Sequence, residues 1–196
     1  MLLSPLMCYL TSLNPLVTCA DNTGGYTRLL ARKADIDPAD WTIGTGVTRH
    51  TLTALAHDSL TDWIEIFPDF TKDASAASEQ TRGKRSYVHT IIAFITGDNF
   101  ENERIIGDGD DCCGYVFLVE HGTGNWFAYG VNYNKKTGTV KSFANMQVQA
   151  SATTDVSGDA EGAGTTLTFS KERVLYSRLP VAPAVIASIT IEPFAP

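Results

Sequence analysis

The feature that most constrains the fold is a pair of apolar runs on either side of a glycine-rich turn. The runs cover 115–119 and 126–133, and the turn between them reads Gly-Thr-Gly-Asn at 122–125. Glycine and asparagine adopt the positive φ angles that a tight turn between antiparallel strands requires. The pattern therefore predicts a β-hairpin in the middle of the chain.

Further strands are predicted where apolar and polar residues alternate, or where β-branched and aromatic residues are enriched. These segments are 25–36, 41–55, 62–71, 87–97, 138–154, 165–174 and 184–191. We find no internal repeat and no hinge-like linker, so we expect one domain over 1–196, with an N-terminal extension at 1–23 and a C-terminal strand or arm at 181–196. The expected fold class is mainly β: a β-sandwich or barrel of two packed antiparallel sheets.

Two segments depart from the strand pattern. Asp98 and Glu101 have the spacing of a capping box, and Gly107 follows, which predicts one short flanking helix at about 98–106. Residues 72–86 are small, polar and charged, without a periodic apolar face. They predict a long exposed loop or an extended hairpin tip, which in a compact domain is usually functional or disordered.

Charge and composition exclude some classes of function. The chain has 196 residues, 43% of them hydrophobic and 19% charged, and a formal net charge of −7. A protein that grips nucleic acid without regard to sequence needs an excess of Lys and Arg, which is lacking here. The apolar N-terminus has no basic residue before Arg28 and is interrupted by Pro5 and Pro15, so it does not match a secretory signal well. Beyond it, no apolar run approaches the ~18 residues of a membrane helix.

The segment Asp-Gly-Asp-Asp-Cys-Cys at 108–113 resembles a metal or redox site only at first sight. Asp108 and Asp110 match the first and third ligands of an EF-hand loop, but Cys112 and Cys113 occupy the fifth and sixth positions and Val119 the twelfth. Two adjacent strand residues face opposite sides, which also argues against zinc. We interpret the segment as a polar corner that leads into the hairpin.

The four cysteines are expected to be reduced and mostly packed in the interior. They are Cys8, Cys19, Cys112 and Cys113. A disulfide framework is typical of much shorter secreted chains, and a bridge between adjacent cysteines is strained.

No catalytic constellation is found. The four histidines, His50, His57, His89 and His121, are not accompanied by a Gly-x-Ser-x-Gly turn, and no phosphate-binding Gly-Lys-Ser/Thr motif follows the glycine-rich segments. The sequence therefore predicts a binding or assembly protein and not an enzyme, with no catalytic, cofactor-binding or metal-binding residue.

The order of the elements resembles that of tail tube proteins of long-tailed bacteriophages, whose fold is shared with type VI secretion tube proteins. Four segments carry the resemblance: an early strand after a polar start (21–31), two strands around a long polar excursion (62–95), the hairpin that follows the short helix (112–131), and a strand, a Gly/Asp turn and a Thr-rich strand (141–172). The likeness covers about 24–180 and is one of pattern and order, without an invariant motif.

The resemblance implies a virion structural protein of the viral tail, assembled in the host cytoplasm. Six subunits would form a ring whose inner sheets join into one barrel, and stacked rings would conduct viral DNA without binding it specifically. Other tail proteins would be partners, and no membrane is involved. An acidic wall would suit this passage because like charges repel. The excursion at 72–86 would reach between subunits through charged contact residues: Lys72, Asp73, Glu79, Arg82, Lys84 and Arg85.

Two alternatives remain open. A neck, tail-terminator or capsid-associated virion protein has a related fold. An exported β-sandwich that binds carbohydrate or a surface would use exposed aromatic residues, for which Trp63, Trp126, Tyr129 and Tyr133 are candidates. Aromatic residues in strands usually belong to the core, which weakens this alternative.

Overall fold

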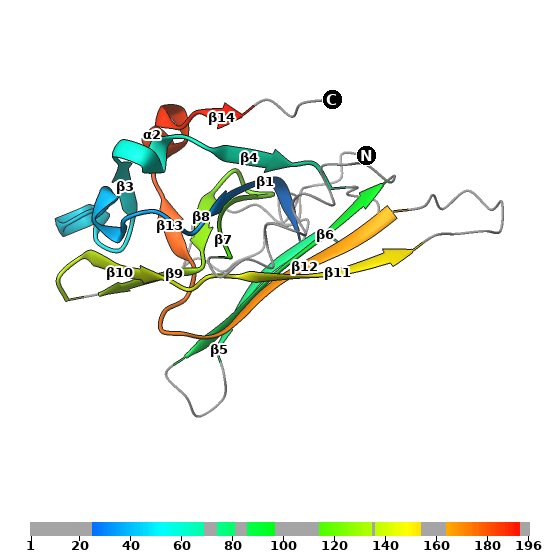
Figure 1. Ribbon diagram of the computed structural model, residues 1–196. Coiled ribbons are helices and arrows are strands. Elements are labelled where there is room, and N and C mark those ends of the chain that lie inside the picture. The colour runs from blue at the N-terminus through cyan, green and yellow to red at the C-terminus, as the bar shows by residue number, and fades with distance from the viewer. Residues whose placement is uncertain are drawn as a thin grey trace, which may run out of the picture.

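The computed structural model describes residues 25–68, 74–80, 86–96, 114–134, 136–153 and 164–192. Strands form two sheets, as Figure 1 shows, which confirms the expected fold class of a mainly β, sandwich-like protein. The predicted helix at 98–106 and all four cysteines lie outside the described residues.

Sheet A has ten strands in the order β14-β4-β1-β7-β8-β13-β3-β2-β10-β9. Their bounds are β1 (Tyr26–Lys33), β2 (Trp41–Ile43), β3 (Leu52–Leu55), β4 (Trp63–Ile66), β7 (Tyr115–His121), β8 (Trp126–Tyr129), β9 (Val131–Asn134), β10 (Thr139–Phe143), β13 (Leu179–Val181) and β14 (Ile191–Glu192). Most pairs are antiparallel, and two short ones, β13 with β3 and β14 with β4, are parallel. The predicted hairpin is confirmed as β7 and β8.

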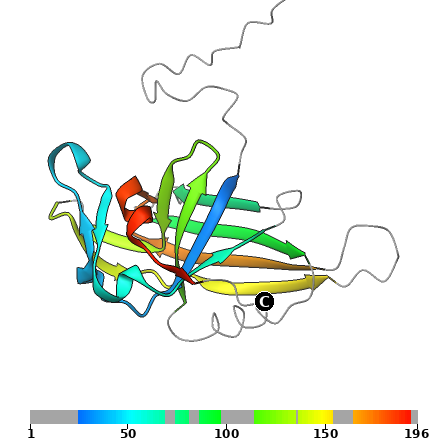
Figure 2. The same cartoon turned by 90° about the horizontal axis from the view of Figure 1, so that it is seen from above.

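Sheet B has four strands, all antiparallel, in the order β11-β12-β6-β5. They are β5 (Ala74–Gln80), β6 (Tyr87–Thr96), β11 (Gln147–Thr153) and β12 (Gly164–Val174). Figures 1 and 2 show β6, β11 and β12 as long strands that run past one end of sheet A. An isolated bridge between Tyr115 and Met146 joins the start of β11 to β7 of sheet A.

The core divides into two clusters on opposite faces of sheet A. Neighbouring residues of β1 show the division: Leu29 packs in a cluster with sheet B residues such as Ile91 and Phe169, and Leu30 packs with Trp41 in a cluster that contains no sheet B residue. The cluster that contains Leu30 includes Trp63 of β4 and Tyr133 of β9, which belong to opposite ends of sheet A. Sheet A therefore curls around this cluster. Because both faces of β1 are buried, its sequence is an unbroken Leu-Leu-Ala run in place of an alternating one.

Short helices connect the strands of sheet A. They are η2 (Pro38–Asp40), η3 (Gly46–Thr48), η4 (His57–Leu60) and α2 (Pro183–Ser188). The alternating segment 41–55 is thus two paired strands, β2 and β3, separated by η3. The strand predicted at 184–191 is wrong over most of its length: Pro183 begins a helix, where its fixed φ and missing N–H cost nothing. Only Val185 of this helix is buried, against the sheet A cluster.

The expectation of a long exposed loop at 72–86 is also wrong in its centre. Residues 74–80 form β5, which pairs with β6 over seven residue pairs from Ala74↔Ala93 to Gln80↔Tyr87. The alternative of an extended hairpin is closer to this arrangement. The segment has no large apolar residue because it is an edge strand whose inward positions, Ala74, Ala76 and Ser78, are small. The backbone pairing with β6, and not hydrophobic periodicity, makes it a strand.

Candidate assembly surface

The two edges of sheet B are the most distinctive surface feature of the described chain. β5 has β6 as its one strand partner and β11 has β12, within the ranges that the structure describes. Both edge strands contain seven residues. A strand edge presents backbone N–H and C=O groups that can pair with another chain, and natural proteins cover or interrupt such edges when they remain monomeric. Sheet B therefore offers two edges of equal length for pairing.

The strand directions make these two edges mutually compatible. Each strand of sheet B runs opposite to its neighbour, so β5 and β11, at the ends of four alternating strands, run in opposite directions. If one copy is rotated about an axis roughly along the strands, its β11 would meet β5 of the first copy in antiparallel orientation. The resulting sheet would continue the existing pattern without a change of hydrogen-bonding type.

The outer face of sheet B, turned away from sheet A, carries almost no charge. Along β6, odd-numbered residues from His89 to Ile95 are buried and even-numbered ones are only partly buried, so the two sets lie on opposite faces. The register places the following described side chains on the outer face: Ser75, Ala77, Glu79, Val88, Thr90, Ile92, Phe94, Gln147, Gln149, Thr166, Thr168 and Ser170. Glu79 is the one charged residue among them. The face combines hydroxyl and amide groups with an apolar stripe on β6.

A polar cluster lies next to the inner side of β5, between the two sheets. It consists of Ser78, His121, Phe127, Tyr129 and Arg178, and we call it the Arg178 cluster. The backbone N–H of Arg178 donates to Ser78 Oγ at 3.3 Å, and its guanidinium lies 3.2 Å from His121 Nε2 and 4.1 Å from the centre of the Phe127 ring. Tyr129 Oη lies 3.1 Å from His121 Nε2 and 3.4 Å from the carbonyl oxygen of Ala76.

Burial and the Arg178 charge together explain the protonation states in this cluster. Burial, and to a smaller extent the positive charge of Arg178, together lower the pKa of His121 to about 4. Burial raises the pKa of Tyr129, which a hydrogen bond from Arg178 partly opposes. Neutral His121 therefore accepts at Nε2 from the guanidinium, since Arg178 can only donate.

His89 is a fully buried histidine beside this cluster, on β6. The backbone N–H of Gly130 donates to His89 Nδ1 at 3.1 Å, and His89 Nε2 lies 3.1 Å from the carbonyl oxygen of Tyr176. A carbonyl only accepts, so the contacts assign the proton to Nε2 and leave the ring neutral. Burial lowers its pKa to about 4, and the bond to Tyr176 opposes this only partly. His89 thus acts as a structural link between β6, β8 and the approach to β13.

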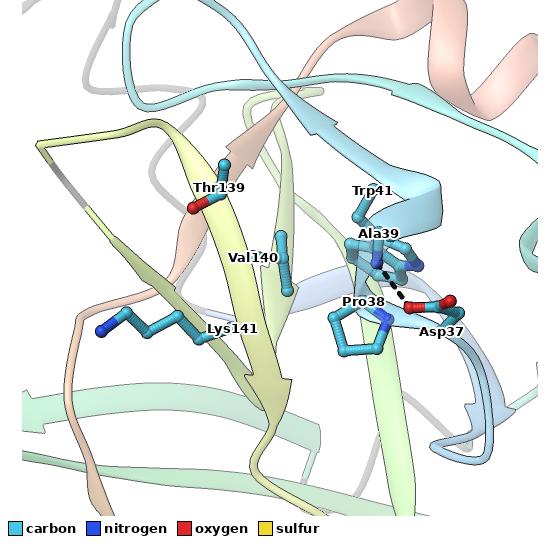
Figure 3. Close-up of a pocket in the computed structure, with 7 residues that line it drawn as sticks. All are labelled: Asp37, Pro38, Ala39, Trp41, Thr139, Val140 and Lys141. Atoms are coloured by element: carbon cyan, nitrogen blue, oxygen red, sulfur yellow. Dashed lines mark hydrogen bonds between the residues drawn. The ribbon is translucent and has the colours of Figure 1, made fainter.

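An open hollow of about 510 Å³ lies between η2 and β10. Figure 3 shows Asp37, Pro38, Ala39 and Trp41 on one side and Thr139, Val140 and Lys141 on the other. Asp37 Oδ1 accepts from the backbone N–H of Ala39 at 2.9 Å, so this carboxylate caps η2. The Lys141 side chain points away from Asp37 in Figure 3. The hollow brings together no pair of groups suited to acid–base chemistry.

Most of the predicted contact residues cannot be placed. Lys72, Asp73, Arg82, Lys84 and Arg85 lie outside the described residues. Glu79 is exposed on β5, the edge strand of sheet B. The sequence pattern did not reveal that residues 74–80 form an edge strand; the only signal was the spacing of small residues in Ala-Ser-Ala-Ala-Ser. It also missed the Arg178 cluster, whose members are far apart in the chain.

The aromatic residues proposed for ligand binding belong to the core. Trp63 and Tyr129 have no exposed surface, Tyr133 is 3% exposed and Trp126 is 8% exposed. The interpretation of strand aromatics as core is therefore confirmed. These four side chains do not form an aromatic binding platform on the surface.

Neither a metal site nor a membrane-spanning helix is found in the described part of the chain. It contains no group of three or more His, Cys, Asp or Glu residues placed to hold a metal ion. The aspartates and cysteines of 108–113 lie outside the described ranges. None of the described helices has the length and apolar character needed to cross a bilayer.

Comparison of the chain with protein-family models, with curated proteins and with solved structures found no match. The surface chemistry and the strand topology are therefore the basis for a functional conclusion.

Proposed function

We propose that this protein is a tail tube subunit of a long-tailed bacteriophage, a virion structural protein that joins copies of itself edge to edge through sheet B. The observation that carries the proposal is the pair of seven-residue edge strands, β5 and β11, that run in opposite directions on one antiparallel sheet. An edge that meets a different edge is a heterologous contact, which forms a closed ring when the rotation between copies closes. Rings of six, stacked on one another, would give a hollow tube.

The placement of sheet A supports one orientation of such a ring. Sheet A packs on the inner face of sheet B through β1, β4, β7 and β8, and the outer face has no described layer over it. In a closed barrel the outside has the larger circumference, so the bulky layer fits on the outside. The outer face of sheet B would then line the channel.

The chemistry of that face suits the passage of DNA in a way that differs from the acidic wall expected from the net charge. Among the paired positions of this face Glu79 is the one charge, so these positions offer DNA phosphates neither cations to bind nor a dense negative field. Non-specific DNA binding depends on Lys and Arg contacts that displace counterions. A neutral wall of hydroxyl and amide groups would let a polyanion slide without adhesion.

The predicted contact residues take a more specific role in this proposal. The 72–86 segment would join two copies because the backbone of β5 pairs with β11 of the next copy. Glu79, on β5, would lie beside this strand pair. Lys72 and Asp73 precede this strand, and Arg82, Lys84 and Arg85 follow it. Charged residues at the ends of an edge strand would select the correct partner over uncontrolled pairing.

Engineered cysteines test the contact directly. Ala77 on β5 and Gln149 on β11 lie on the outer face at opposite edges of sheet B. Within one copy three strand spacings separate them, about 14 Å, which is too far for a disulfide. In a background with the four native cysteines replaced by serine, the double variant Ala77→Cys/Gln149→Cys should give an oxidised ladder of linked subunits. Gln147→Cys combined with Ser75→Cys or Glu79→Cys covers shifts in register.

Matched controls separate edge pairing from random oxidation. Ala77→Cys with Thr168→Cys places the second thiol on central strand β12, and this variant should not give a ladder. Negative-stain electron microscopy of the untagged protein over a range of concentrations should show rings or tubes. Rings without any ladder across the register series would refute pairing through β5 and β11. A monomer at every concentration, with no ladder, would count against a tube protein altogether.

A further inference from the structure

Among the described arginines that are at least partly buried, Arg178 differs from Arg28 and Arg32 because it forms no ion pair with a described carboxylate. Arg28 forms a two-point ion pair with Glu65, with N···O distances of 2.7 and 3.0 Å. Arg32 contacts Asp62 at 3.2 Å. Arg178, also partly buried, has no carboxylate within ion-pair distance in the described part of the chain. Partial burial removes hydration from this cation, and no described residue replaces it with an opposite charge.

The neighbours of the Arg178 guanidinium are neutral and leave much of it available. A guanidinium has five N–H donors in a planar fork. One Nη1 donor is directed at His121 Nε2 at 3.2 Å, and another hydrogen bond reaches Tyr129. Phe127 covers one side, with its ring centre 4.1 Å from the guanidinium carbon. The remaining donors have no acceptor among the described residues.

We propose that the Arg178 cluster is an oxyanion-binding site for a carboxylate or phosphate group. The planar fork of Arg178 matches either group at two points. Phe127 packs against the fork, and His121, whose ring contacts Phe127 and Tyr129, accepts one of its donors, so the fork is held in place before the ligand arrives. Preorganisation of this kind lowers the cost of binding.

Two sources can supply such a group. The Arg178 backbone is hydrogen-bonded to Ser78 of β5, so the site lies beside the edge at which a second copy would pair. A carboxylate of that copy is one source, and a dissolved phosphate is the other. The site itself exists in a single copy of the chain and does not depend on tube assembly.

Inorganic phosphate is the probe. We would titrate sodium phosphate against sodium chloride at equal ionic strength and constant pH 7.5, and follow the Arg178 side-chain N–H and the His121 and Tyr129 ring signals by NMR. The expected result is a saturable shift in wild type that is lost in Arg178→Gln and kept in Arg28→Gln. Arg28 is the matched control because it also lies over an aromatic ring, Trp126, but already has a carboxylate partner.

Arg178→Lys keeps the charge but removes the fork, so it should bind phosphate several-fold more weakly; it also serves if Arg178→Gln does not fold. A dilution series without phosphate identifies the source. If the same signals move with protein concentration, a carboxylate of a second copy occupies the site, which supports the proposal. A shift that does not saturate, or one that persists unchanged in Arg178→Gln or Arg178→Lys, would overturn it.

Discussion

His89 makes the stability of this protein sensitive to acid, and its geometry sets the size of the effect. The ring is neutral in the folded state because Nδ1 accepts from Gly130 N–H and Nε2 donates to the carbonyl of Tyr176. Protonation would place a hydrogen where Gly130 already donates and would bury a charge with no exposed surface. The folded pKa of His89 is lowered to about 4, against about 6.5 in an unfolded chain.

The sign and size follow from proton linkage. Between these two pKa values the unfolded chain binds more protons, so the free energy of unfolding falls as the pH falls. The contribution of His89 is complete above pH 6.5 and is lost as the pH drops toward 4. Between pH 7.5 and pH 4.5 the loss amounts to about 2–3 kcal/mol from this one residue.

Urea denaturation at pH 7.5 and pH 4.5 measures this loss. His89→Gln keeps an acceptor and a donor but cannot titrate, so the difference in pH dependence between wild type and variant should be about 2–3 kcal/mol. His57→Asn is the control for loss of an imidazole elsewhere in the chain, because His57 is exposed at φ 47°, where Asn is tolerated. An NMR titration gives a second measurement. The reasoning is refuted if His89 titrates near pH 6.5 or if His89→Gln leaves the pH dependence unchanged.

Two further predictions concern packing and buried hydrogen bonds, and both are measured by chemical denaturation at pH 7.5. Gly164→Val should destabilise the fold by about 1–3 kcal/mol, because a Cβ there would meet the Phe94 ring and lie 2.6 Å from the Ile95 carbonyl oxygen; an unchanged midpoint would show that β12 has room. Ser59→Ala should cost about 1–3 kcal/mol, since it leaves the buried Trp41 indole N–H, now 3.1 Å from Ser59 Oγ, without an acceptor. A loss below about 0.5 kcal/mol would mean that another group satisfies the indole.

The sequence identified correctly those strands in which the side chains of the segment itself favour the extended conformation. Residues 87–97 and the 115–133 hairpin have β-branched and aromatic residues on buried positions and glycines at the turn, so local pattern and tertiary structure agree. The segment 184–191 shows the limit of that signal. Ala, Val and Ile in a short run suit a buried strand or a buried helix, and Pro183 at the first helical position decided in favour of the helix.

By itself, the sequence determined that this chain forms a mainly β domain, where most of its strands lie, and that its strand aromatics are core. Only the tertiary structure decided that 74–80 is a strand, because that state depends on pairing with β6 and not on its small side chains. It also decided which strands are edges and which residues share the nearly uncharged outer face, since both depend on register between distant segments. The Arg178 cluster is the clearest case: Arg178 meets His121, 57 residues away, and Ser78, 100 residues away. No local pattern encodes such a contact, because the packing of the two sheets creates it.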